Sequence, residues 1–161
     1  MIVVSDTSPV LNLARVGRLE LLALLYKQVI IPTAVYAELT DPQYGAPAID
    51  FASTPWLTVA VANDQARVSV LCEELDPGEA EAIVLATECH ADLLLVDERR
   101  GRRIATRLGL TVTGLLGVLA EAKKAGLIDQ AKPVLDQLIN EARFWIGPDL
   151  YAEFLAEQGE R

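Results

Sequence analysis

Residues 93–97 read LLLVD, four apolar residues followed directly by a carboxylate. A short, continuously apolar run is typical of a central strand in a parallel sheet, where both faces of the strand are buried. Residues 2–6, IVVSD, have the same character at the N-terminus and also end in an aspartate. Each run is followed by a helical pattern, which favours an α/β fold in which parallel strands alternate with helices.

The rest of the chain continues this alternation of strands and helices. Strands are expected at residues 2–5, 29–31, 57–61, 93–96 and 111–113, with 57–61 as an edge strand. Helices are expected at residues 9–17, 19–26, 32–39, 48–52, 64–75, 78–89, 98–108, 115–125, 129–142 and 148–158, and residues 41–47 are expected to form a loop. The pattern predicts a three-layer α/β/α sandwich around a central, mostly parallel sheet.

Length and composition favour a single domain over residues 1–161. At 52% hydrophobic residues, a chain of this size buries roughly 70% of its extended surface in one core. We expect no membrane-spanning segment, because no stretch is long and apolar enough. We also expect no signal peptide, because Ser5 and Asp6 interrupt the first apolar run. Cys72 and Cys89 lack a metal-binding spacing and are expected to be free thiols of a cytoplasmic protein, with a redox or zinc-binding role as the alternative. The one histidine, His90, follows a predicted helix end, where a cap or surface role is expected.

The charge distribution is uneven. The net charge of −9 argues against a protein that coats nucleic acid nonspecifically. However, residues 99–107 hold five of the 14 lysines and arginines, directly after the carboxylate at position 97. Arg99, Arg100 and Arg103 are candidates for binding RNA phosphates through bidentate hydrogen bonds. The alternative is that they pair with the surplus surface acids.

Four acidic positions are expected to share one crevice. In open parallel sheets, sites form at the carboxyl ends of the strands, where strand order reverses. Asp6 and Asp97 end two strands, while Glu38 and Glu81 lie on helices near that edge. Carboxylates crowded in this way are usually compensated by a hard divalent metal ion held by oxygen ligands.

Each acid also has a structural explanation. Asp6 is a possible helix cap, Asp97 a possible turn cap, and Glu38 a possible solvated residue on a helix face. Glu79 and Glu81 lie two apart on one helix and cannot share a face. Glu81 is favoured as the inward residue because apolar residues follow it with core-like spacing, although either glutamate could complement the helix dipole.

Four sequence motifs resemble those of PIN domains. They are VSDTSPVL at residues 4–11, IPTAVYAEL at 31–39, GEAEAI at 78–83 and LLVD at 94–97. The likeness covers residues 2–125 and is strongest to the VapC-like branch, in which a DTSP start accompanies a GEAEA helix. The third motif departs from the family, because many VapC toxins carry an aspartate where this chain offers two glutamates. The fourth lacks the Thr-x-Asp pattern that is common in toxins.

The resemblance implies a Mg²⁺- or Mn²⁺-dependent endoribonuclease. Toxins of toxin–antitoxin pairs are among the proteins of this type, so a toxin role is one implied function. The implied catalytic metal ligands are Asp6, Glu38, Glu81 and Asp97, with Thr7, Ser8 and Glu79 in supporting positions. Thr7 and Ser8 would hydrogen-bond Asp6 or a water molecule, or cap the helix that opens at Pro9. The implied partners are RNA, a small antitoxin that inserts a basic side chain into the acidic site, and a second copy of the chain.

Two other function classes compete with this reading. A PIN-like protein that has lost activity and serves as a binding module is the alternative. A phosphoacceptor or nucleotide-binding α/β domain is less favoured, because the chain has no Gly-x-Gly-x-x-Gly and no Walker lysine. The C-terminal helices within residues 129–158 are expected either to pack on the domain or to form an interface through Phe144, Trp145, Leu150, Tyr151, Phe154 and Leu155.

Overall fold

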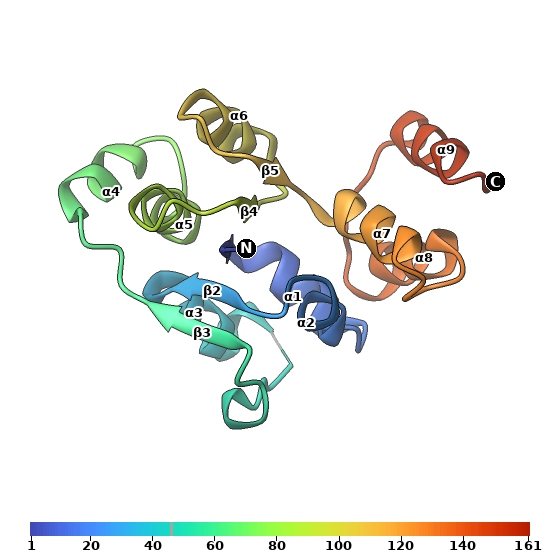
Figure 1. Ribbon diagram of the computed structural model, residues 1–161, viewed down its shortest axis with the longest axis horizontal. Coiled ribbons are helices and arrows are strands. Elements are labelled where there is room, and N and C mark those ends of the chain that lie inside the picture. The colour runs from blue at the N-terminus through green and yellow to red at the C-terminus, as the bar shows by residue number, and fades with distance from the viewer. Residues whose placement is uncertain (46) are drawn as a thin grey trace.

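The computed structural model describes residues 1–45 and 47–161, and its centre is a parallel sheet (Figure 1). The strands are β1 (Val3–Ser5), β2 (Val29–Pro32), β3 (Leu57–Ala60), β4 (Leu93–Leu95) and β5 (Val112–Thr113). Their order is β3-β2-β1-β4-β5, and every neighbouring pair is parallel. The predicted parallel sheet is confirmed, with β3 at an edge.

Helices connect the strands and cover both faces of the sheet. They are α1 (Thr7–Arg15), α2 (Glu20–Tyr26), α3 (Thr33–Thr40), α4 (Gln65–Leu71), α5 (Pro77–Glu88), α6 (Arg99–Arg107), α7 (Leu115–Lys124), α8 (Ala131–Glu141) and α9 (Pro148–Glu157). Figure 1 shows α4, α5 and α6 gathered on one side and α7, α8 and α9 on the other. Two short 3₁₀ turns, Pro42–Tyr44 and Phe51–Ser53, follow α3. The first lies in the predicted loop 41–47, of which residue 46 is outside the described residues.

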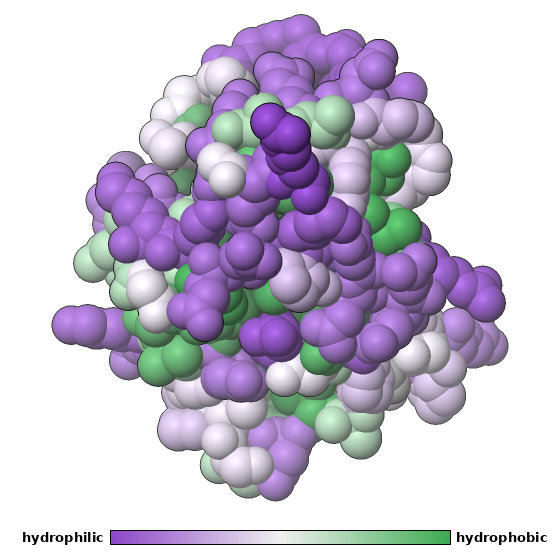
Figure 2. Space-filling view, turned by 90° about the vertical axis from the view of Figure 1, so that its right-hand side faces the viewer, coloured by the Kyte–Doolittle hydropathy of each residue, from purple (hydrophilic) through white to green (hydrophobic). Residues whose placement is uncertain are grey.

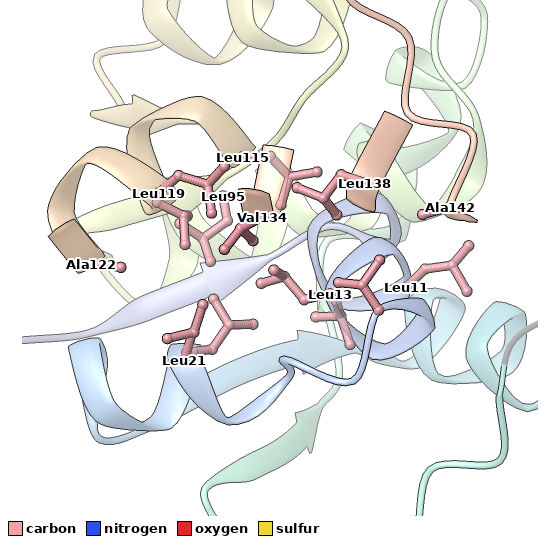
Figure 3. Packing of buried hydrophobic residues seen from close by; sticks show 14 of the residues in the cluster. Leu11, Leu13, Leu21, Leu95, Leu115, Leu119, Ala122, Val134, Leu138 and Ala142 are labelled. Carbon is pink, nitrogen blue, oxygen red and sulfur yellow. The ribbon is translucent and has the colours of Figure 1, made fainter. Parts of the chain in front are cut away.

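The alternation of side chains along the strands creates two cores, one on each face. Val3 and Leu95 join the core formed with α1, α2, α7, α8 and α9, and Val4 and Leu94 join the core formed with α4, α5 and α6. Figure 3 shows side chains of the first core pointing toward one another from α1, α2, β4, α7 and α8. The three-layer α/β/α architecture follows from this two-sided burial.

The strand order reverses between β1 and β4. From β1 the chain moves outward through β2 to β3, and then returns to place β4 on the other side of β1. The backbone N–H of Asp6 donates to the carbonyl of Leu95 over 2.9 Å, so the two carboxyl ends lie side by side. This is the position where open parallel sheets form their sites.

The C-terminal helices pack on the rest of the chain. Phe154 and Leu155 of α9 are buried in the first core together with residues of α8. The Lys123 ammonium lies 2.7 Å from the Glu160 carboxylate, which also accepts the backbone N–H of Ala131 over 2.9 Å. Packing against the domain therefore accounts for this buried part of α9.

Trp145 and Leu150 are the exposed members of the C-terminal stretch, at 84% and 49% exposure. Figure 2 looks onto the side of the molecule that carries α7, α8 and α9, where hydrophobic patches lie between hydrophilic residues.

Within the described chain Cys72 and Cys89 are free thiols. In residues 1–45 and 47–161, every helix is too short or too polar to cross a bilayer.

Candidate active site

Asp6 lies at the centre of a group of acidic side chains and is only 4% exposed. It stands at the N-cap position of α1, but within the described chain its side chain makes no capping hydrogen bond. Burial raises the pKa of Asp6 well above its usual range, and the negative charges of Asp76, Glu79 and Glu38 act in the same direction. The backbone N–H of Thr7 offsets part of this increase. Capping therefore does not explain Asp6.

The two hydroxyl residues that follow Asp6 hold other carboxylates. Helix α1 begins at Thr7, earlier than the predicted start at Pro9. The Thr7 hydroxyl donates a hydrogen bond to Glu38, and the Ser8 hydroxyl donates to Asp97 over 3.0 Å. One turn of α1 thus connects an acid on α3 with an acid beyond β4, and neither hydroxyl caps the helix.

Glu38 lies on α3 against the start of α5. A methyl group at Gly78 would lie 2.9 Å from one Glu38 carboxylate oxygen and 3.1 Å from the other, so a side chain at this position would displace the Glu38 carboxylate. Burial raises the pKa of Glu38, an effect that the Thr7 hydroxyl opposes. Glu38 is therefore a half-buried member of the acidic group, not a solvated surface residue.

Glu79 is as deeply buried as Asp6, at 4% exposure. It forms a capping box with Asp76: its backbone N–H donates to the Asp76 carboxylate over 2.8 Å, and Oε1 accepts the Asp76 N–H over 3.4 Å. Its other oxygen, Oε2, is buried and finds no hydrogen-bond partner in the described chain. Burial, followed by the charges of Asp76 and Glu98, raises the pKa of Glu79 to about 7.

The space around the Glu79 carboxylate depends on the close approach of α6 to α5. A methyl group at Gly101 of α6 would lie 2.7 Å from Oε2, well inside normal contact. The absence of a side chain at Gly101 therefore leaves the space in which Oε2 is held. A buried carboxylate oxygen without a partner is costly and calls for a cation or a proton.

Glu81 is placed differently from the sequence expectation. Its carboxylate accepts the Thr33 hydroxyl and the Ala34 backbone N–H, each over 3.0 Å. It therefore caps the start of α3. This corrects the expectation that Glu81 is the inward glutamate, a position that the buried Glu79 takes.

Asp97 uses both of its carboxylate oxygens. Oδ1 accepts the backbone N–H of Leu115 over 2.7 Å, at the start of α7, and Oδ2 accepts the Ser8 hydroxyl. Burial raises the pKa of Asp97 overall, although these two hydrogen bonds and the nearby Arg102 lower it. Asp97 thus combines the predicted capping role with a hydrogen bond to Ser8, two residues after Asp6.

The donor set suits a hard divalent cation, although the side chains are not gathered into a finished site. In residues 1–45 and 47–161 no three His, Cys, Asp or Glu side chains form a group that could hold a metal ion as they stand. Glu79 nevertheless has a buried carboxylate oxygen without a partner, and burial raises the pKa of Asp6, so a cation bound between them would compensate both groups. Carboxylate oxygens are the ligands that Mg²⁺ and Mn²⁺ prefer.

The predicted RNA-binding arginines all lie on the first two turns of α6, beside Asp97. Arg99, Arg100 and Arg103 are exposed, and Arg100 donates to the Glu74 carbonyl over 3.2 Å. The two ion pairs found in the described chain both use lysine. The alternative that these arginines pair with surface acids is therefore not observed in this part of the chain.

Comparison with known proteins places this geometry in a family. The family model DUF3368, described as a PIN domain, matches residues 2–160. The chain belongs to the PIN domain family. PIN domains are typically nucleases and generally use divalent metal ions.

A solved structure supports the fold. A PilT N-terminus domain protein from the hyperthermophilic archaeon Sulfolobus solfataricus P2 matches with a TM-score of 0.55 and 22% identity, covering 76% of this chain and 93% of the other. No curated protein matched the chain.

The sequence interpretation missed residues around the acids. Asp76 and Glu98 add negative charge near Glu79, and Asn12 donates to the Ser8 hydroxyl over 3.0 Å. The Asp76-x-x-Glu79 spacing is a capping-box signal, which predicts the two hydrogen bonds between these residues. No comparable signal marks Asn12.

Proposed function

We propose that this PIN domain is a metal-dependent endoribonuclease that uses Mg²⁺ or Mn²⁺. Asp6, Glu38, Glu79 and Asp97 are the proposed ligands, directly or through water, so Glu79 replaces Glu81 in the set. The observation that carries the proposal is the buried, unpartnered Oε2 of Glu79, in a group where burial and like charge raise the pKa of Asp6. A divalent cation would compensate both features.

The residues around the acids have separate tasks in this proposal. When bound, a divalent ion supplies positive charge beside the scissile phosphate and lowers the pKa of water. Thr7 and Ser8 orient the carboxylates of Glu38 and Asp97. The arginines of α6 bind substrate phosphates next to Asp97.

Cleavage of a labelled RNA tests this function. We expect cleavage with Mg²⁺ or Mn²⁺, none with EDTA, and a loss of at least about 100-fold in Asp6→Asn and Asp97→Asn. Glu79→Gln should lose activity, whereas the matched variant Glu81→Gln should keep it. Equal losses in the two glutamine variants would contradict the assignment of the third acid.

The arginines are tested by the salt dependence of RNA binding. Arg99→Gln and Arg100→Gln are each expected to weaken binding and to reduce the slope of log K against log salt by about 1, as for the loss of one phosphate contact. The assay uses catalytically inactive protein and EDTA, so that the RNA stays intact. An unchanged affinity and slope would remove these residues from the RNA-binding surface.

A PIN-like binding module without catalytic activity is the second candidate function. It is favoured by the finding that no three acids in the described residues form a ready metal-binding group. No cleavage of diverse RNAs in either metal, together with retained RNA binding, would establish it.

We also propose that the protein acts as a VapC-like toxin in the cytoplasm, as a homodimer neutralised by a small antitoxin. The sequence motifs at residues 4–11 and 78–83 support this narrower role. A short reading frame upstream of the gene, growth arrest on expression, and rescue by the upstream product are the expected results. A monomer in light scattering would remove the dimer.

A further inference from the structure

Trp145 is an exposed indole beside the candidate active site. It lies in the irregular segment between α8 and α9 and is 84% exposed. It borders a groove of about 610 Å³, a size typical of ligand-binding sites. Its lining is mostly apolar, with Phe144 and Leu150 beside Trp145, and it also includes Asp97, Arg99 and Arg102.

A second groove meets the first at the same residues. It measures about 360 Å³ and is also lined by Asp97, Arg99, Phe144 and Trp145, to which it adds Arg143, the acidic Glu98, Ser8 and Asn12. Both grooves therefore run from the Trp145 indole to a proposed metal ligand. The combined surface pairs an aromatic face with cationic side chains next to the acids.

Hydrogen bonds to backbone carbonyls hold the start of this segment in place. The guanidinium of Arg15 donates to the carbonyl of Ala142 over 3.5 Å and to that of Tyr44 over 2.8 Å. The backbone N–H of Phe144 donates to the carbonyl of Leu138 over 2.9 Å. Arg143 adopts a left-handed conformation at φ +58°, which is uncommon for a residue other than glycine and is found often at functional sites. The indole is thus presented from an anchored turn.

We propose that Trp145 is a substrate-binding residue that stacks on an unpaired base of a single-stranded nucleic acid, while Arg99 and Arg143 contact its phosphates. This inference rests on the proposed nuclease function and deepens it. Aromatic side chains stack on bases only where those bases are free of a duplex stack, and arginine provides the matching phosphate contacts. Arg99, Arg102 and Arg143 line the two grooves and provide groups that bind phosphates, and both grooves reach Asp97.

Tryptophan fluorescence tests the stacking directly. The chain has two tryptophans, so Trp56→Phe leaves Trp145 as the only indole. We expect a short single-stranded RNA, added in EDTA to prevent cleavage, to quench this emission. The same RNA with abasic nucleotides should quench less. In parallel, Trp145→Ala should weaken binding at least fivefold, with Trp145→Phe within about twofold of the wild type and Trp56→Phe unchanged.

The outcomes separate this inference from the proposed function. Unaltered emission, or equal binding by Trp145→Ala, overturns the stacking role, and metal-dependent cleavage in the same preparation leaves the nuclease proposal standing. Loss of both RNA binding and cleavage in the wild type overturns both. Conversion of a dimer to a monomer by Trp145→Ala, without a change in RNA affinity, assigns the surface to a protein interface and also overturns the inference.

Discussion

Replacing Glu79 with glutamine is expected to change how stability depends on pH when no divalent metal is present. The folded chain raises the pKa of Glu79 from 4.5 to about 7, chiefly through burial. The folded state therefore binds this proton more tightly than the unfolded state does. The associated stability is fully present below about pH 4.5 and is lost as the pH rises through about 7.

The size of this effect follows from the pKa difference. At about 1.4 kcal/mol per pKa unit, a change from 4.5 to about 7 corresponds to on the order of 3 kcal/mol. Glu79→Gln removes this ionisation, so its stability relative to wild type should improve by that order between pH 4.5 and 8.5. Saturating Mg²⁺ should offset most of this difference, because it stabilises the ionised wild type by about 2.7 kcal/mol at 100 times its Kd.

Urea unfolding in EDTA at several pH values measures the difference. Glu81→Gln is the matched control: it loses part of a cap at the start of α3 and should not gain stability relative to wild type as the pH rises. A difference between wild type and Glu79→Gln that stays constant from pH 4.5 to 8.5 would refute the reasoning.

Three further substitutions test individual contacts. Gly101→Ala adds a methyl group 2.7 Å from Glu79 Oε2 and should therefore reduce RNA cleavage at least about 10-fold in an initial-rate assay. This loss is expected even though alanine has a higher helix propensity than glycine, by about 1 kcal/mol. Ser8→Ala removes the hydrogen bond to Asp97 and should cost about 1 kcal/mol in urea unfolding, together with weaker metal binding in a calorimetric titration. Glu160→Gln, far from the candidate site, should cost about 1 kcal/mol because it weakens a partly buried ion pair, while cleavage per folded molecule stays at the wild-type rate.

The sheet and its site edge could be predicted from the sequence because the signals are local. Each buried strand is a short apolar run, and parallel strands place their carboxyl ends at one edge. Asp6 and Asp97 were therefore expected beside one another, and the Asp6–Leu95 hydrogen bond shows that β1 and β4 carry them there.

The third acid could not be assigned by periodicity. Helix α5 is buried on most of its surface, with residues 78–80 and 82–86 all buried, so apolar spacing does not single out one inward face. Tertiary contacts distinguish the two glutamates. Glu79 packs against Gly101 of α6, whereas Glu81 accepts the backbone N–H of Ala34 at the start of α3. The groove at Trp145 also could not be predicted from the sequence, because its lining residues are far apart in the chain.

A crystal structure with Mn²⁺, located by its anomalous scattering, tests the central claim most directly. The proposal predicts a peak between Asp6 and Glu79, about 2–2.3 Å from carboxylate oxygens, with Glu38 and Asp97 bound directly or through water. A peak at Glu81, or no peak among these acids at a Mn²⁺ concentration that supports RNA cleavage, would contradict it.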